Sequence, residues 1–219
     1  MPSSLKLIIG NKNYSSWSLR PWLVLKHFQI PFAEEIVLLD TPDTRSRLLE
    51  FSGSAKVPVL VDRDIKIWDS LAIIEYLAER FPECSIWPNS LVDRAEARCV
   101  SAEMHSGFLA LRAEMPLNCR AHDRKVQIGE ALRGDIRRVI ELWSDLRTRF
   151  AAAGPWLFGE FSAADAMYAP VALRFVTYGV EVAEPARSFV DAVLESAPVR
   201  DWLAVAQAEP QVIPSDEAG

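Results

Sequence analysis

Apolar segments in the first part of the chain are short and change their periodicity from one to the next. Four of them have the length and composition of strands, at 5–9, 32–39, 57–61 and 65–68. Between these, apolar residues at helical spacing predict helices over 17–28 and 71–81, and a polar link, helical or irregular, covers 43–52. The order β-α-β-α-β-β-α predicts a small sheet with helices packed against it.

The later part of the chain has helical periodicity almost throughout. Two long apolar stripes predict helices that end near Pro116 and Gly154. The sequence FSAAD at 161–165 matches a capping box and predicts the start of another helix. Two shorter helices are expected near 184–196 and 198–208, followed by a polar tail that is expected to fray.

This change of pattern divides the chain into two predicted domains. An α/β domain is expected over 1–82, a linker with the sequence ECSIWPNS over 83–90, and an all-α domain over 91–219. The chain has 219 residues, of which 50% are hydrophobic and 25% charged. That composition is typical of a globular protein with a sizeable buried core.

Charge and cysteine content exclude several classes of function. A net charge of −6 argues against nucleic acid as a partner, and no apolar run has the roughly 18 residues of a membrane-spanning helix. The apolar run near the N-terminus is too short for a signal peptide. Cys84, Cys99 and Cys119 form no CxxC pair, and the histidines lack zinc-ligand spacing, so we expect free thiols, a cytoplasmic location and no metal.

Hydroxyl groups gather where the first strand leads into the first helix, in NKNYSSWSLRPWL at 11–23. Serine caps helix N-termini, and capping alone explains such residues. The same position also favours an anionic ligand, because free N–H groups and the helix dipole make this end positive. At least one hydroxyl of Tyr14, Ser15, Ser16 and Ser18 is therefore a candidate for ligand binding.

Two further motifs stand at the ends of predicted elements. Pro58 opens a strand in AKVPVLV, where the Val57–Pro58 bond is either cis or an ordinary trans bond at a sheet edge. Asp69 and Ser70 begin the helix in WDSLAIIEYL, where capping is the simplest role. Together these motifs fit an extended peptide-like ligand: Val57 pairs with its backbone, Asp69 binds its ammonium group and Ser70 binds its carboxylate. Positive charge for a second carboxylate, or for solvated surface, comes from Lys12, Arg20 and Lys56.

With KVPVL, DSLAIIEYL and FSAADAMYAPVALRF in this order, the whole chain resembles the cytosolic glutathione transferase family. The SSWS at the start of the first helix is similar to the SSCS of the zeta class, which includes maleylacetoacetate isomerases, with Trp17 in place of the cysteine. The resemblance implies a thioredoxin-like first domain, an all-helical second domain, glutathione as cosubstrate, a homodimer and a role in detoxification.

The resemblance also implies roles for individual residues. Ser15, or its neighbour Ser16, would hydrogen-bond the glutathione sulfur. The remaining glutathione contacts would come from Lys56, Val57, Pro58, Asp69 and Ser70. A second-substrate site would lie between the domains, with the candidates Tyr14, Met104, His105, Phe108 and Arg112, although Met104 and Phe108 also fit a helical core.

Conjugation of the glutathione thiolate to a small electrophile is the leading hypothesis for the function. A glutathione-dependent cis-trans isomerase of the maleylacetoacetate type is the first alternative, and a noncatalytic glutathione-binding protein is the second. The sequence lacks GxSxG, GxGxxG and Walker-type motifs, which argues against a hydrolase and against nucleotide chemistry.

Overall fold

A four-stranded mixed sheet organises the first part of the chain in the computed structural model, which describes residues 5–219. Residues 1–4, which belong to the predicted first domain and to the N-terminal segment assessed for a signal peptide, lie outside the described residues. The strands are β1 (Leu5–Ile9), β2 (Ala33–Ile36), β3 (Val59–Asp62) and β4 (Ile65–Trp68). In the order β2-β1-β3-β4, β2 runs parallel to β1, while β3 and β4 are antiparallel to their neighbours.

Two strands are shorter than their apolar patterns predict. β2 ends at Ile36 because its partner β1 ends at Ile9, and the N–H of Leu39 donates to the Asn11 side chain instead (2.8 Å). β3 begins one residue after Pro58, whose ring nitrogen has no hydrogen to donate to a neighbouring strand.

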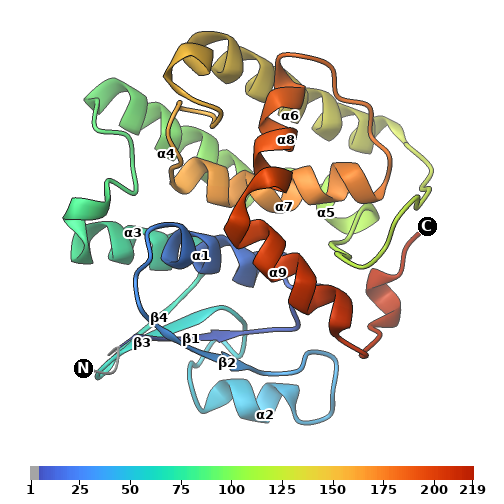
Figure 1. The fold of residues 1–219 in the computed structure, drawn as a ribbon. Coiled ribbons are helices and arrows are strands. Elements are labelled where there is room, and N and C mark those ends of the chain that lie inside the picture. The colour runs from blue at the N-terminus through green and yellow to red at the C-terminus, as the bar shows by residue number, and fades with distance from the viewer. Residues whose placement is uncertain (1–4) are drawn as a thin grey trace.

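Helices cover both faces of the sheet (Figure 1). Alternate residues of β1 point to opposite faces: Leu7 and Ile9 join the main core with α1 (Ser16–His27) and α3 (Ser70–Arg80). Ile8 points the other way, into a small cluster between the sheet and α2 (Thr44–Leu49) that also contains Val37, Leu48 and Val59. The face that carries α1 and α3 also meets the helical part of the molecule.

The helical part packs around one central helix. Its helices are α4 (Leu91–Ser106), α5 (Leu109–Glu114), α6 (Glu130–Phe150), α7 (Ala163–Thr177), α8 (Ala186–Glu195) and α9 (Ala197–Ala208). Short 3-10 turns lie at Pro82–Cys84, Ala151–Ala153 and Pro214–Asp216. α7 contacts α1, α4 and α8 and is buried at every position except Val176, which explains why its sequence is apolar on all sides.

The capping box predicted at FSAAD is confirmed. Ser162 is the N-cap of α7, and the Asp165 carboxylate accepts from the backbone N–H of Ser162 (2.7 Å). Asp165 also accepts from the N–H of Leu157 (2.8 Å), so this one buried side chain fixes both the start of α7 and the loop before it. Among the helices of residues 5–219, none combines the length and apolar character that crossing a membrane requires.

Two expectations about the helical part are wrong. The first apolar stripe is not one helix, because the chain breaks at Gly107 and Phe108, where Phe108 has a φ of 55°. α5 then begins anew, with the Asp135 side chain of α6 accepting from the N–H of Leu111 (3.0 Å). The polar tail does not fray either, because Glu209 and Glu217 bond to the segment between β1 and α1.

Candidate functional site

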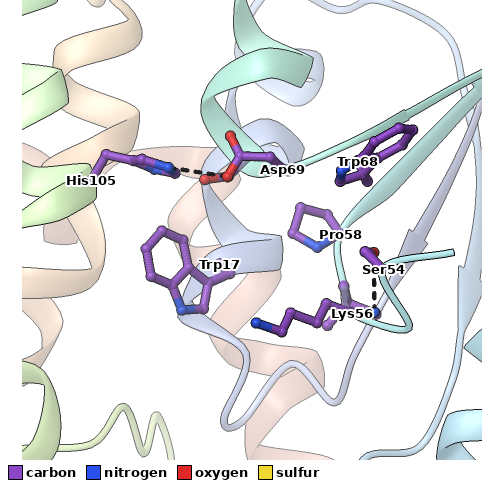
Figure 2. A pocket seen from close by; sticks show the side chains of 9 residues that line it. Trp17, Ser54, Lys56, Pro58, Trp68, Asp69 and His105 are labelled. Carbon is purple, nitrogen blue, oxygen red and sulfur yellow. Dashed lines mark hydrogen bonds and ion pairs between the residues drawn. The ribbon is translucent and has the colours of Figure 1, made fainter. Parts of the chain in front are cut away.

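A pocket of about 550 Å³ lies where α1, the start of α3 and the end of α4 approach one another (Figure 2). The residues that line it come from α1, from the segment before β3, from the β4–α3 junction and from α4. They are Trp17, Ser54, Lys56, Val57, Pro58, Trp68, Asp69, Ser70 and His105. The Val57–Pro58 bond is cis. The structure therefore brings together three of the motifs that the sequence analysis considered jointly.

Asp69 occupies a backbone conformation that L-residues rarely adopt. It is the N-cap of α3 with a φ of 84°, and its Oδ1 accepts from the N–H groups of Leu71 (2.9 Å) and Ala72 (3.1 Å). A non-glycine residue at such a φ costs on the order of 1–3 kcal/mol, and such residues concentrate at functional sites. The cap fixes the carboxylate at the pocket wall and leaves Oδ2 available to other partners.

His105 of α4 bonds to that second oxygen. Its Nε2 lies 3.0 Å from Asp69 Oδ2, and this contact joins the sheet-containing part to the helical part across the pocket (Figure 2). The His105 Nδ1 is buried and has no hydrogen-bond partner in the described part of the chain. Ser70 also lines the pocket, and its buried Oγ has no hydrogen-bond partner among residues 5–219. Both atoms could accept or donate a bond to a bound molecule.

Ser15 and Ser16, at the N-terminus of α1, directly precede the pocket residue Trp17 in the chain but are not themselves among the residues that line the pocket. Ser15 is the N-cap, and its Oγ donates to the Oγ of Ser18 (2.7 Å). The Ser16 Oγ accepts from the Arg174 guanidinium (3.2 Å), so its own hydrogen remains free to donate. Both residues are more than nine-tenths buried. Both hydroxyls thus have partners inside the protein, at the helix end where the dipole favours an anion.

Positive charge surrounds Trp17. The Cζ atoms of Arg20 and Arg112 lie 4.1 and 5.3 Å from the centre of its ring. Arg20 is fully buried, and none of its three guanidinium nitrogens has a hydrogen-bond partner in residues 5–219. Burial, with repulsion from Arg174 and Arg112, lowers the pKa of Arg20 to about 9. The inner side of the site is therefore electropositive.

The other residues considered from the sequence have different positions. Tyr14 is buried, and its hydroxyl donates to Glu217 (2.6 Å); burial and that carboxylate raise the pKa of Tyr14. Met104 and Phe108 belong to the hydrophobic core. Lys12, considered for a ligand carboxylate or for solvated surface, is buried in an ion pair with Glu34 (2.8 Å). In residues 5–219 no group of three His, Cys, Asp or Glu residues is arranged to hold a metal.

Three pocket residues were not among the candidate site residues: Trp17, Ser54 and Trp68. Trp17 directly follows Ser16, and Trp68 directly precedes Asp69, so adjacency to the motifs was the available signal. His105 was considered for a second substrate, but the structure makes it a partner of Asp69. Lys56 extends along the opposite wall toward Trp17 and is exposed (Figure 2).

Two protein-family models match the chain. The model "Glutathione S-transferase, N-terminal domain" matches residues 14–80, and "Glutathione S-transferase, C-terminal domain" matches residues 127–204. Together they span about two thirds of the chain. The first match contains the pocket residues from α1 to the start of α3.

Individual relatives differ in what their names say. A "Probable maleylacetoacetate isomerase" of Caenorhabditis elegans is 38% identical over 96 residues, which are 44% of either protein, so the aligned part is less than half of that relative. A "Stringent starvation protein A homolog" of Haemophilus ducreyi is 28% identical over 179 residues, 81% of this chain and 78% of that protein.

Solved structures confirm the predicted fold class. A glutathione transferase homologue from Burkholderia GL BGR1, crystallised with bound glutathione, superposes with a TM-score of 0.73 at 23% identity, covering 94% of this chain and 99% of that one. Ure2p in complex with glutathione gives a TM-score of 0.72 at 17% identity, covering 92% and 98%. The shared architecture is a thioredoxin-like sheet with its helices, followed by an all-helical part.

Proposed function

Because this chain belongs to the glutathione S-transferase family, we propose that it binds glutathione in the pocket beside Asp69 and conjugates it, through a new bond from its sulfur, to an electrophilic carbon of a small substrate. One observation carries the proposal. A single cavity is lined by Val57 and Pro58, the strained cap Asp69, its neighbour Ser70, and Trp17 in the first turn of α1.

Each end of glutathione has a matching group in this arrangement. The Asp69 Oδ2 accepts from the γ-glutamyl ammonium, and the Ser70 hydroxyl with its N–H binds the neighbouring carboxylate at the N-terminus of α3. The peptide groups of Val57 pair with the cysteinyl backbone, as an added strand does. Lys56, which is exposed on the pocket wall, attracts the glycyl carboxylate.

The chemistry requires a thiolate near neutral pH. A free thiol has a pKa of about 8.5, so only a few per cent is ionised at pH 7. Lowering that pKa by about two units requires about 2.7 kcal/mol of preferential stabilisation of the anion. A hydrogen bond to a charged group contributes about 1.5–3 kcal/mol, and a helix N-terminus contributes about 0.3–1 kcal/mol. One serine hydroxyl at the start of α1 is therefore sufficient without losing its own proton.

Two adjacent hydroxyls can serve this purpose. The resemblance of SSWS to the SSCS of the zeta class favours Ser15, although its hydrogen is donated to Ser18 and must turn toward the sulfur. Ser16 already accepts from Arg174, which polarises its hydroxyl and leaves the hydrogen available. We assign the sulfur contact to Ser15, with Ser16 as the alternative.

Alanine variants test the proposal and separate the two serines. Glutathione binding is measured by calorimetry, and turnover is measured with an aryl chloride activated by nitro groups. Ser15→Ala should reduce turnover by roughly 10- to 150-fold, the loss of about 1.5–3 kcal/mol from a hydrogen bond to the anion, while keeping most of the glutathione affinity. Unchanged turnover in Ser15→Ala with loss in Ser16→Ala would move the role to Ser16. Absence of glutathione binding by the unaltered protein at millimolar concentration would refute the proposal.

A glutathione-dependent isomerase is the second candidate. The electropositive surroundings of Trp17 favour an acidic electrophile, and the relative from Caenorhabditis elegans is named as a probable maleylacetoacetate isomerase. In that reaction the thiolate adds to the substrate and leaves again, so glutathione is not consumed. Isomerisation of a maleyl diketo acid without net loss of glutathione would establish this activity.

A noncatalytic role is the third candidate, since relatives named stringent starvation protein A homologues match the chain as well. Glutathione binding without turnover on a panel of electrophiles would favour it. With the leading function we also propose a cytoplasmic homodimer that acts in detoxification. Sedimentation of the purified protein tests the dimer.

A further inference from the structure

The segment that joins β1 to α1 is polar yet almost completely buried. Asn11 and Asn13 have no exposed surface, and Lys12 and Tyr14 are 5% and 6% exposed. This segment, residues 10–15, leads directly to the serines of the proposed sulfur site. Buried N–H and C=O groups need hydrogen-bond partners, so something must satisfy this backbone.

The partners come from the other end of the sequence. After α9, residues 209–219 return along the 10–15 segment; we call residues 209–219 the strap (Figure 1). The Glu209 carboxylate accepts from two consecutive backbone N–H groups, with Oε1 2.8 Å from the nitrogen of Lys12 and Oε2 2.9 Å from that of Asn13. Further along the strap, Gln211 bonds to Asn11, and Glu217 accepts from the hydroxyl of Tyr14.

Only a carboxylate fits between these two donors. Each of its oxygens accepts one N–H, whereas a glutamine amide would offer one oxygen and turn its NH₂ group toward the second donor. Charged acceptors also form shorter and stronger hydrogen bonds than neutral ones. The geometry at Glu209 is therefore specific to an acid.

The consequence reaches Ser15 through a tight turn. The N–H of Ser15 donates to the carbonyl of Asn11 (2.9 Å), and the carbonyl of Asn13 accepts from Cys119 (3.1 Å). Fixing the amides of Lys12 and Asn13 thus fixes the turn that ends at Ser15 and Ser16. Misplacing a catalytic group by about 1 Å is enough to lower a rate by roughly 10²-fold.

We propose that Glu209 is a positioning residue, which holds the 10–15 segment so that the serine hydroxyls at the start of α1 meet the sulfur of bound glutathione. The inference rests on the proposed function. Glu209 does not itself line the pocket, and it acts through two backbone amides.

Variants at Glu209 retain other contacts that hold the 10–15 segment and the strap. The indole N–H of Trp202 donates to the carbonyl of Lys12 (2.9 Å), and the Arg120 guanidinium bonds to strap carbonyl oxygens and to the Tyr14 hydroxyl. Glu209→Ala is therefore expected to fold. Asp201→Asn supplies the matched control, because Asp201 is an exposed acid on α9 near the strap.

The experiment titrates the thiol of bound glutathione by its thiolate absorbance and measures kcat, KM and glutathione affinity. Glu209→Ala should raise the pKa of the bound thiol by about one unit, a tenfold change in its ionisation constant. Affinity should change by less than about threefold, because the anchors at Asp69 and Ser70 lie on another element. The pKa of the bound thiol in Glu209→Gln should lie between those in the unaltered protein and in Glu209→Ala, and Asp201→Asn should give the same pKa as the unaltered protein. An unchanged thiol pKa in folded Glu209→Ala would overturn the inference.

Hydrogen exchange separates this outcome from failure of the proposed function. In Glu209→Ala the amides of Lys12 and Asn13 should exchange faster than in the unaltered protein and in Asp201→Asn. Unchanged exchange would refute the holding role, whatever the protein binds. If these amides exchange faster in Glu209→Ala but the unaltered protein does not bind glutathione, the proposed function and the catalytic effect of Glu209 are refuted. The structural role of Glu209 in holding the 10–15 segment would still stand.

Discussion

Replacing Asp69 by asparagine separates two roles that its carboxylate combines. Oδ1 caps α3 through the N–H groups of Leu71 and Ala72, while the charge centred near Oδ2 would bind the ligand ammonium. Asparagine keeps an oxygen for the cap and tolerates a positive φ, but it removes the charge. Alanine removes both roles and is strained at a φ of 84°.

The two variants should therefore differ in stability more than in affinity. Asp69→Asn should change the free energy of unfolding by less than about 0.5 kcal/mol, whereas Asp69→Ala should lower it by about 2 kcal/mol, half from the cap and half from backbone strain. A charge-assisted hydrogen bond to an ammonium contributes about 1.5–3 kcal/mol. The Asp69 side chain is 39% exposed, so solvent screening reduces this to about 1–2 kcal/mol. Glutathione should then bind about 5- to 30-fold more weakly to both variants.

Calorimetry with glutathione and urea unfolding of the same preparations give both quantities. The test is sharp because the two properties should change independently. If the Asp69→Asn protein binds glutathione as tightly as the unaltered protein, a charge interaction between Asp69 and the ligand ammonium is excluded. If Asp69→Asn lowers the free energy of unfolding as much as Asp69→Ala does, the cap requires more than an oxygen at the Oδ1 position.

Two further predictions concern basic side chains, Arg20 and His27. Arg20→Met keeps an extended side chain against Trp17 and removes a buried charge that has no hydrogen-bond partner in residues 5–219. The free energy of unfolding, measured in urea, should therefore rise by at least about 1 kcal/mol. A fall of that size would show that favourable interactions offset the cost of burying the guanidinium. Burial lowers the pKa of His27 below 6.5, so the unfolded chain takes up this proton first and the protein loses stability as the pH falls below 6.5. His27→Phe keeps the stacking on Phe161 and should lose less stability between pH 7 and pH 5.5; equal losses would assign the acid sensitivity to other groups.

Local patterns were sufficient for most of the secondary structure. The strand at 5–9, the β3–β4 hairpin and α6 follow from apolar periodicity and turn residues, because each depends on contacts close in sequence or on one repeated face. The capping box at Ser162 is also local, since its two partners are three residues apart. The break at Phe108 escaped this reasoning, because the residues on both sides of it face the same core and keep the apolar spacing unbroken.

The site divides in the same way. Residues at the ends of elements, such as Val57, Pro58, Asp69 and Ser70, could be selected from the sequence and line one pocket. The pairing of His105 with Asp69 joins the start of α3 to the end of the next helix, α4, which are far apart in the sequence, and no local pattern encodes it. The burial of Lys12 against Glu34 belongs to this second group, because a lysine is ordinarily solvated unless folding supplies a partner.

The sequence by itself determined the order of the elements, the two-part architecture and the motifs at the element ends, because hydrophobic periodicity, proline and caps act over a few residues. Only the tertiary structure decided that the 209–219 strap holds the 10–15 segment, and that an arginine in α1 is buried without a hydrogen-bond partner in the described residues. These features come from groups nearly two hundred residues apart, or from packing on every side of one side chain. Their energies depend on which surfaces meet when the chain folds, and the neighbours of a residue in sequence do not specify that.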